Sequence, residues 1–174
     1  MTCEHPKDMR PKRTAVLRES RKYATITEKK KQQNNSGEQE EESMSKYLDR
    51  ARELRAIVTP HYNCGQSVVL PFAADAGLTE QQAMGICANF GGGLKRAAAC
   101  GAITGGLVVL GLFGIDNPAK YYQALRQNHE GMLDCAELLR RNKELGREKK
   151  PHCDALVFEC VTLVERLLRE RGKL

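Results

Sequence analysis

Apolar residues recur at helical spacing from about residue 45 onward, and strand-like alternation is nearly absent. The first such stripe consists of Leu48, Ala51, Leu54 and Val58. Ser45 stands directly before it as a natural N-cap, and Pro60 follows it as a stop. The pattern therefore predicts a first helix between these two residues.

Two further helices are marked by their capping residues. Asn63 can cap a helix over CGQSVVLPFAADAG, which Gly77 ends and Pro71 interrupts or kinks. Thr79 opens TEQQAMGICANF, where Thr-Glu-Gln-Gln matches a capping box. Phe90 then leads into three consecutive glycines, which we interpret as a flexible loop.

The second half of the chain continues the helical pattern. We expect one helix after Pro118 that carries apolar residues as far as Leu139, and a last helix from about Cys153 to Arg171. Gly146 and Pro151 lie on either side of the charged connection between these two helices. The predicted fold is all-α: a compact bundle of five or six helices around a buried central helix rich in glycine and alanine.

That central segment, AAACGAITGGLVVLGLFGI, runs for 19 residues without a charge. This is close to the length that crosses a bilayer, so a transmembrane helix is one reading. Five glycines and amphipathic neighbours favour the other reading, a buried helix without membrane insertion. Ala97, Gly101 and Gly105 recur at spacing four, so they offer a bare face to a packed helix or to a bound group.

The first 43 residues differ sharply from the rest. KKKQQNNSGEQEEES carries almost no apolar side chain and cannot offset the entropy of ordering itself. We predict a disordered polar tail over 1–43 and one helical domain over 44–174. The purine-rich codons that would encode GEQEEES resemble a ribosome-binding site, so we also hypothesise that translation starts at Met44.

The formal net charge of +6 does not predict nucleic-acid binding. Lysine and arginine are interleaved with acidic residues, as in DRARELR, and no stripe of basic and aromatic residues stands out. A secretory signal is not recognisable at the N-terminus either, which favours a cytoplasmic location where thiols stay reduced.

Seven cysteines are many for 174 residues. In a reducing compartment they bind metal, perform redox chemistry or fill the core. CxxC, CxxCH and closely spaced zinc or ferredoxin pairs are all absent from the sequence, so any site must be assembled from distant helices.

Cys100 and Cys64 are the strongest candidates, since each falls at a predicted helix start. The positive end of the helix dipole lowers the pKa of such a thiol and favours the nucleophilic thiolate. The alternative is that Cys100 is a buried small hydrophobe, which is common for free cysteine. His61 and Cys64 also form an HxxC pair, a weak metal signal without a second pair.

The remaining cysteines divide between site and core. Cys135 lies on the apolar side of its predicted helix, and Cys87 is more typical of the core. Cys153 and Cys160 lie seven residues apart on the same face of the last helix. Either of these two can be the site residue, with the other in the core.

Several of these segments together resemble the family labelled C_GCAxxG_C_C. The resemblance rests on NCGQSVVLPFAADAGL, ANFGGGL, CGAITGGLVVLGL, the cysteine of DCAELL and a cysteine that opens a final LV-rich helix. It covers about residues 46–168 and implies a small prokaryotic helical bundle with redox activity. The four shared cysteines of the family would fall on Cys64, Cys100, Cys135 and, in preference to Cys160, Cys153.

The resemblance leaves three hypotheses. In the first, Cys64, Cys100, Cys135 and Cys153 bind an iron–sulfur cluster or another soft metal for electron transfer, with Gly101 and Gly105 making room for the cofactor. In the second, Cys100 is the attacking thiolate of a thiol–disulfide protein, with Cys64 or Cys135 as its partner. In the third, the chain is a non-catalytic helical interaction module. A redox partner protein is expected in the first two, and homo-oligomer formation stays open.

Overall fold

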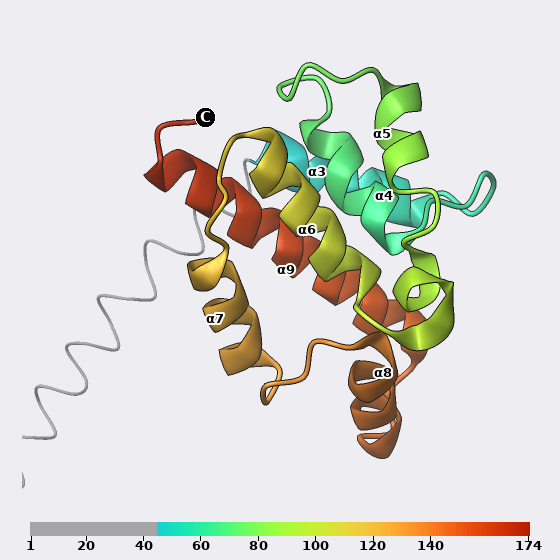
Figure 1. The fold of residues 1–174 in the computed structure, drawn as a ribbon. Helices are drawn as coiled ribbons and strands as arrows, with labels where there is room; N and C mark the ends of the chain where they lie inside the picture. Colours follow the sequence, from blue (N-terminus) through green and yellow to red (C-terminus); the bar gives the residue numbers. More distant parts are fainter. Residues whose placement is uncertain (1–44) are drawn as a thin grey trace, which may run out of the picture. The chain divides into compact units, whose positions relative to one another are not determined.

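The computed structural model describes residues 45–174, and these residues form an all-α fold without strands. The expectations for residues 1–43 and for the start at Met44 lie outside this part of the chain. The helices are α3 (Lys46–Ala56), α4 (Cys64–Val69), α5 (Glu80–Ile86), α6 (Gly101–Leu112), α7 (Ala119–Asn128), α8 (Cys135–Glu144) and α9 (Lys149–Glu170). Two short turns accompany them, the 3-10 turn η2 (Leu70–Phe72) and the π-type turn η3 (Gly93–Ala97). Figure 1 shows α6 and α9 at the centre, with α3 and α4 on one side and α7 on the other.

The helix starts that were predicted from capping residues are confirmed. Ser45 accepts a hydrogen bond from the backbone N–H of Leu48. Asn63 and Thr79 each form a complete capping box with the glutamine three residues later. α4 ends at Val69 and η2 begins at Leu70, and Pro71, which has no backbone N–H, is the second residue of η2.

Three helix boundaries differ from the prediction. α3 ends at Ala56, so Val58 lies beyond the helix and is exposed rather than part of the apolar stripe. The single helix expected after Pro118 is two, because Glu130 and Gly131 both have positive φ and break it. α9 begins at Lys149 and includes Pro151, which the first turn tolerates because its N–H needs no helical partner.

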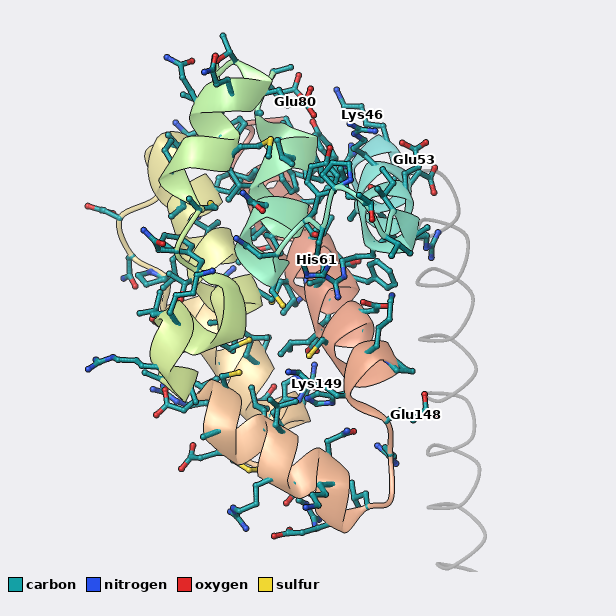
Figure 2. All side chains as sticks on the ribbon, turned by 90° about the vertical axis from the view of Figure 1, so that its right-hand side faces the viewer. Lys46, Glu53, His61, Glu80, Glu148 and Lys149 are labelled. Carbon is teal, nitrogen blue, oxygen red and sulfur yellow. The ribbon has the colours of Figure 1, made fainter. Side chains whose placement is uncertain are left out.

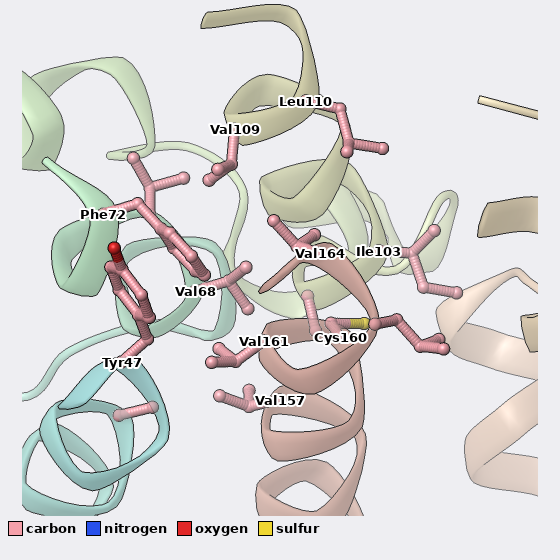
Figure 3. Close-up of a cluster of buried hydrophobic side chains, with 14 of the residues drawn as sticks. Tyr47, Val68, Phe72, Ile103, Val109, Leu110, Val157, Cys160, Val161 and Val164 are labelled. Atoms are coloured by element: carbon pink, nitrogen blue, oxygen red, sulfur yellow. The ribbon is translucent and has the colours of Figure 1, made fainter. Parts of the chain in front are cut away.

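The core lies where α4, α6 and α9 pack together (Figure 3). Its fully buried valines include Val68, Val109, Val157, Val161 and Val164. Tyr47 of α3 stacks on Phe72 of η2, with ring centroids 4.3 Å apart. This apolar centre packs α4, α6 and α9 against one another.

The glycines of α6 allow close helix contact. A Cβ atom on Gly105 would lie 3.0 Å from the carbonyl oxygen of Gly65 in α4, and one on Gly106 would lie 2.1 Å from the hydroxyl of Tyr121. Ala97 lies outside α6 and does not extend the bare face. Among residues 45–174, no helix is both long and apolar enough to cross a membrane.

The triple-glycine segment forms a tight turn and not the flexible loop that we expected. Gly92, Gly93, Leu94, Lys95 and Ala97 all have positive φ. Three of these are not glycine, and each such residue costs about 1 kcal/mol or more. A Cβ on Gly93 would lie 2.6 Å from the Cβ of Cys135, so the turn packs directly against the start of α8.

Candidate functional site

Four cysteines stand at or near the N-terminal ends of four helices. Cys64 is the first residue of α4 after the Asn63 cap, Cys100 is the N-cap of α6, and Cys135 is the first residue of α8. Cys153 lies in the second turn of α9. All four are free thiols.

Each of these four thiols acts on the pKa of at least one other, and we call the four the thiol cluster (Cys64, Cys100, Cys135 and Cys153). Cys64 and Cys153 shift each other's pKa in opposite directions, with a side-chain hydrogen bond between them as the largest cause. The charge of Cys64 raises the pKa of both Cys100 and Cys135, which places these thiols within its electrostatic reach.

Backbone hydrogen bonds tie the starts of α6 and α8 together. The N–H of Cys100 donates to the carbonyl of Leu133 over 3.2 Å, and the N–H of Cys135 donates to that of Ala98 over 2.7 Å. Ala99 and Asp134 form an isolated antiparallel bridge at the same place. The two cysteines are therefore held in register by the backbone that precedes each helix.

Cys64 is the acidic member of the thiol cluster. The hydrogen bond from Cys153 lowers the pKa of Cys64 to about 6, well below its ordinary value of 9.0. Burial opposes this shift, while the guanidinium of Arg55 and the helical backbone reinforce it. Cys153 supplies the proton of the shared hydrogen bond, and its own pKa is raised for that reason.

Cys100 behaves in the opposite way, so the prediction that its helix position would lower its pKa is wrong. Burial raises the pKa of Cys100 to about 11, because the thiol is only 6% exposed. The backbone groups of Ile103 and Ala102 favour the thiolate, as the dipole argument requires, but burial outweighs them. The pKa of Cys100 is therefore raised where that of Cys64 is lowered.

Cys135 is half-buried, and burial raises its pKa as well, with Lys149 acting in the other direction. Cys87 is fully buried in the core, where burial raises its pKa to about 11. Cys160 is also fully buried, and burial raises its pKa well above the ordinary value. Of the two candidates on α9, Cys153 is the one whose side chain is the largest cause of the pKa shift of Cys64. Cys3 lies outside the described residues.

We expected Gly101 and Gly105 to make room for a cofactor, but protein atoms occupy the space beside both of them. A Cβ on Gly101 would lie 2.2 Å from the carbonyl oxygen of Phe90 and 3.6 Å from the Cβ of Cys64. Gly105 faces the backbone of Gly65. Gly101 thus borders the thiol cluster, and both glycines bring α6 close to α4.

Two charged residues near the thiol cluster were missed from the sequence. The guanidinium of Arg55 pairs with the carboxylate of Asp154 at 2.6 Å, and their side chains are 7% and 18% exposed. One signal was present for Arg55, which lies seven residues after Leu48 on the buried stripe of α3, where a cation needs a partner. Nothing in the local sequence marks Asp154 as that partner.

A histidine beside the cluster also lacks a described partner. The Nε2 atom of His152, next to Cys153 in the chain, is buried without a hydrogen bond, and burial lowers the pKa of this histidine. His61 is exposed in the connection between α3 and α4. Figure 2 shows this connection and the start of α9, marked by Glu148 and Lys149, on one side of the molecule.

The thiol cluster does not have the geometry of a site for a single metal ion. Within residues 45–174, no three His, Cys, Asp or Glu side chains come together as ligands of one ion. Thiol–disulfide exchange needs a thiol of lowered pKa and a second thiol that acts on it, and the pKa shifts of Cys64 and Cys153 have these directions.

Comparison with known proteins agrees with the cysteine pattern. No curated protein and no solved structure matches the chain. A family model described as "Putative redox-active protein (C_GCAxxG_C_C)" matches residues 62–167, a range that contains all four thiols of the cluster. This match confirms the resemblance, and the chain belongs to the C_GCAxxG_C_C redox-active family.

Proposed function

We propose that this protein performs thiol–disulfide exchange, with Cys64 as the attacking thiolate and Cys153 as the thiol that completes the reaction. What supports the proposal is the opposite shift of two neighbouring thiols: the pKa of Cys64 is lowered and that of Cys153 is raised, each mainly by its interaction with the other side chain. The family description supports redox activity without naming a reaction.

The reaction begins when the Cys64 sulfur attacks one sulfur of a substrate disulfide. A mixed disulfide forms, and the other substrate sulfur leaves as a thiolate. Cys153 then loses its proton to that leaving group, and its sulfur attacks the Cys64 sulfur. The Cys64–Cys153 disulfide forms, and the second substrate sulfur is released. Two electrons and the proton of Cys153 have then passed from the protein to the substrate, whose second sulfur leaves as a thiolate and takes a proton from water to complete the dithiol.

Cys100 and Cys135 have a supporting place in this scheme. Their raised pKa values keep both thiols protonated near neutral pH, so neither competes with Cys64 as a nucleophile. This assignment reverses the roles that we expected from sequence, where Cys100 was the attacking residue. The chemistry fits a reducing cytoplasm in a prokaryotic cell, with a redox partner protein as the source of electrons.

A second candidate is an iron–sulfur cluster bound by the four thiols. The observation that favours it is their number, since exchange needs two thiols and the thiol cluster holds four. Helix N-termini and Arg55 also offset anionic charge at this place. The described geometry does not gather three ligands for one ion, and we assign no step to a metal.

Anaerobic redox titration distinguishes the candidates. The purified chain is equilibrated in glutathione buffers of graded potential, alkylated, and mapped by mass spectrometry. We expect Cys64 and Cys153 to become protected together with one midpoint, and Cys87→Ser to leave that midpoint unchanged. If the four thiols of the cluster titrate independently, thiol exchange at this pair is excluded. Charge-transfer absorption with stoichiometric iron would favour the second candidate instead.

A further inference from the structure

Arg55 connects the two chain segments that carry the reacting thiols. Its Nε donates to a carboxylate oxygen of Asp154 over 2.7 Å, and Asp154 directly follows Cys153. Its Nη1 donates to the carbonyl oxygen of Tyr62 over 3.0 Å, two residues before Cys64. One guanidinium on α3 thus holds both the start of α4 and the first turns of α9.

The same connection is reinforced from α9. The ammonium of Lys150 donates to the second carboxylate oxygen of Asp154 over 2.6 Å and to the backbone carbonyl of Arg55 over 3.1 Å. The Arg55 side chain is 7% exposed, so its position is fixed by these partners and by the packing of α3 on α9. A planar guanidinium can serve two partners at once, whereas a lysine ammonium in its place would be a point charge on a flexible stem.

Cys64 has to be directed to one partner because the thiol cluster offers three. Cys100 on α6 and Cys135 on α8 both lie within its electrostatic reach, and either could in principle capture it on oxidation. The α6 and α8 thiols are placed by the turn before α6, through the hydrogen bonds between residues 98–100 and 133–135. Among residues 45–174, the hydrogen bonds and ion pairs of the Arg55 side chain go to Tyr62 and Asp154, on the Cys64 and Cys153 side, and not to either of those segments.

We propose that Arg55 is a positioning residue that selects Cys153 as the disulfide partner of Cys64, by joining the Tyr62 carbonyl to Asp154. This inference rests on the proposed exchange at Cys64 and Cys153, and it assigns a separate role to a residue outside the thiols. The sulfur–sulfur bond forms between the Cys64 thiolate and the Cys153 sulfur with loss of two electrons and the Cys153 proton, which the disulfide substrate accepts as its own sulfur–sulfur bond breaks.

The test is a map of disulfide pairing after mild oxidation. The reduced full-length chain is treated with a limiting small disulfide, trapped by alkylation, and digested for mass spectrometry. In the wild type, we expect the Cys64–Cys153 disulfide to be the main product. In Arg55→Gln, we expect the ratio of this pair to the Cys64–Cys100 and Cys64–Cys135 pairs to fall about tenfold, as loss of a charge-assisted hydrogen bond implies.

Two companion variants separate position from charge. Arg55→Lys keeps the positive charge but cannot bridge both partners, so the pairing ratio should fall here as well. Asp154→Asn weakens the bond to α9 while leaving Arg55 in place, and it should shift the ratio in the same direction. Arg50→Gln is the matched control, because Arg50 lies on the same helix with exposed partners only. It should leave the ratio unchanged.

The outcomes are distinct. If Cys64–Cys153 dominates in the wild type and remains dominant in Arg55→Gln and Asp154→Asn, the role of Arg55 is overturned while the proposed function stands. If Arg55→Lys restores the wild-type ratio, charge and not bridging selects the partner, and the inference is wrong. If the wild type pairs Cys64 with another cysteine, the proposed function fails first. Should Arg55→Gln unfold, Asp154→Asn decides the question.

Discussion

The acidity of Cys64 should depend on Cys153. Cys153→Ala removes the hydrogen bond that is the largest cause of the lowered pKa of Cys64, and burial then acts against the thiolate with only Arg55 and the backbone opposing it. We therefore expect the pKa of Cys64 to rise from about 6 toward its ordinary value of 9.0. Cys153→Ser keeps a hydroxyl donor and should retain most of the effect.

The size of the effect follows from two opposing factors. At pH 6, a thiol with a pKa of about 6 is half ionised, whereas one with a pKa of 9.0 is ionised to about 0.1%, a roughly 500-fold difference in thiolate. The more basic thiolate is intrinsically faster by roughly 20-fold at a Brønsted slope near 0.45. The net expectation is that Cys64 in Cys153→Ala reacts about 20-fold more slowly at pH 6 than in the wild type.

Iodoacetamide alkylation between pH 5 and 9, followed residue by residue with mass spectrometry, measures this directly. The wild-type rate at Cys64 should level off above pH 7, and the rate in Cys153→Ala should still be rising at pH 8. Cys87→Ala is the control, since burial alone perturbs the pKa of Cys87. A wild-type midpoint near 9, or a midpoint that Cys153→Ala does not move, refutes the assignment of Cys64 as the acidic thiol.

Three further predictions concern packing and charge. Gly105→Ala places a Cβ 3.0 Å from the α4 backbone and should lower the free energy of unfolding in urea by about 1–3 kcal/mol. Gly111→Ala, with open space in the same helix, should be neutral or stabilising by up to about 1 kcal/mol. Gly93→Ala and Gly92→Ala both place a Cβ at a residue with positive φ, but only the Cβ at position 93 meets Cys135. Gly93→Ala should therefore lower the free energy of unfolding by about 2 kcal/mol more than Gly92→Ala, and it should change the redox titration of the thiol cluster. Burial alone would raise the pKa of Glu159, yet hydrogen bonds from the end of α7 lower it below 4.5 overall. A carboxyl group whose pKa is lower in the folded than in the unfolded chain stabilises the fold at pH values above its unfolded pKa. The stability advantage of the wild type over Glu159→Gln, measured by urea unfolding at a series of pH values, should therefore shrink as the pH falls below about 4.5.

Local chemistry explains why the helix starts could be predicted. The caps at Ser45, Asn63 and Thr79 depend on residues within three positions of one another, so the sequence contains the whole interaction. The break between α7 and α8 was missed because Glu130 has a positive φ. A glutamate in a sequence does not predict that conformation, which is uncommon for residues other than glycine. The cluster-forming cysteines were recognisable as a set through the family pattern, while their distances from one another depend on tertiary packing.

Position on a helix does not explain which thiol is reactive. Cys64, Cys100 and Cys135 all stand at helix N-termini, yet the pKa is lowered at Cys64 and raised at the other two. The helix dipole is therefore common to the three and cannot distinguish them. What differs is a neighbour from another helix: Cys64 alone receives the hydrogen bond of Cys153 and the nearby charge of Arg55.

Those two neighbours come from α9 and α3, which are distant from Cys64 in sequence but packed against α4 in the fold. The reactivity of Cys64 thus depends on the docking of α3 and α9, and a mutation that loosens either helix should raise its pKa without touching a cysteine. Cys100, by contrast, is held neutral by its own burial. A substitution that loosens α3 from α9 would consequently bring the acidities of the two thiols closer together, and the preference for attack by Cys64 would weaken before the helical fold itself is lost.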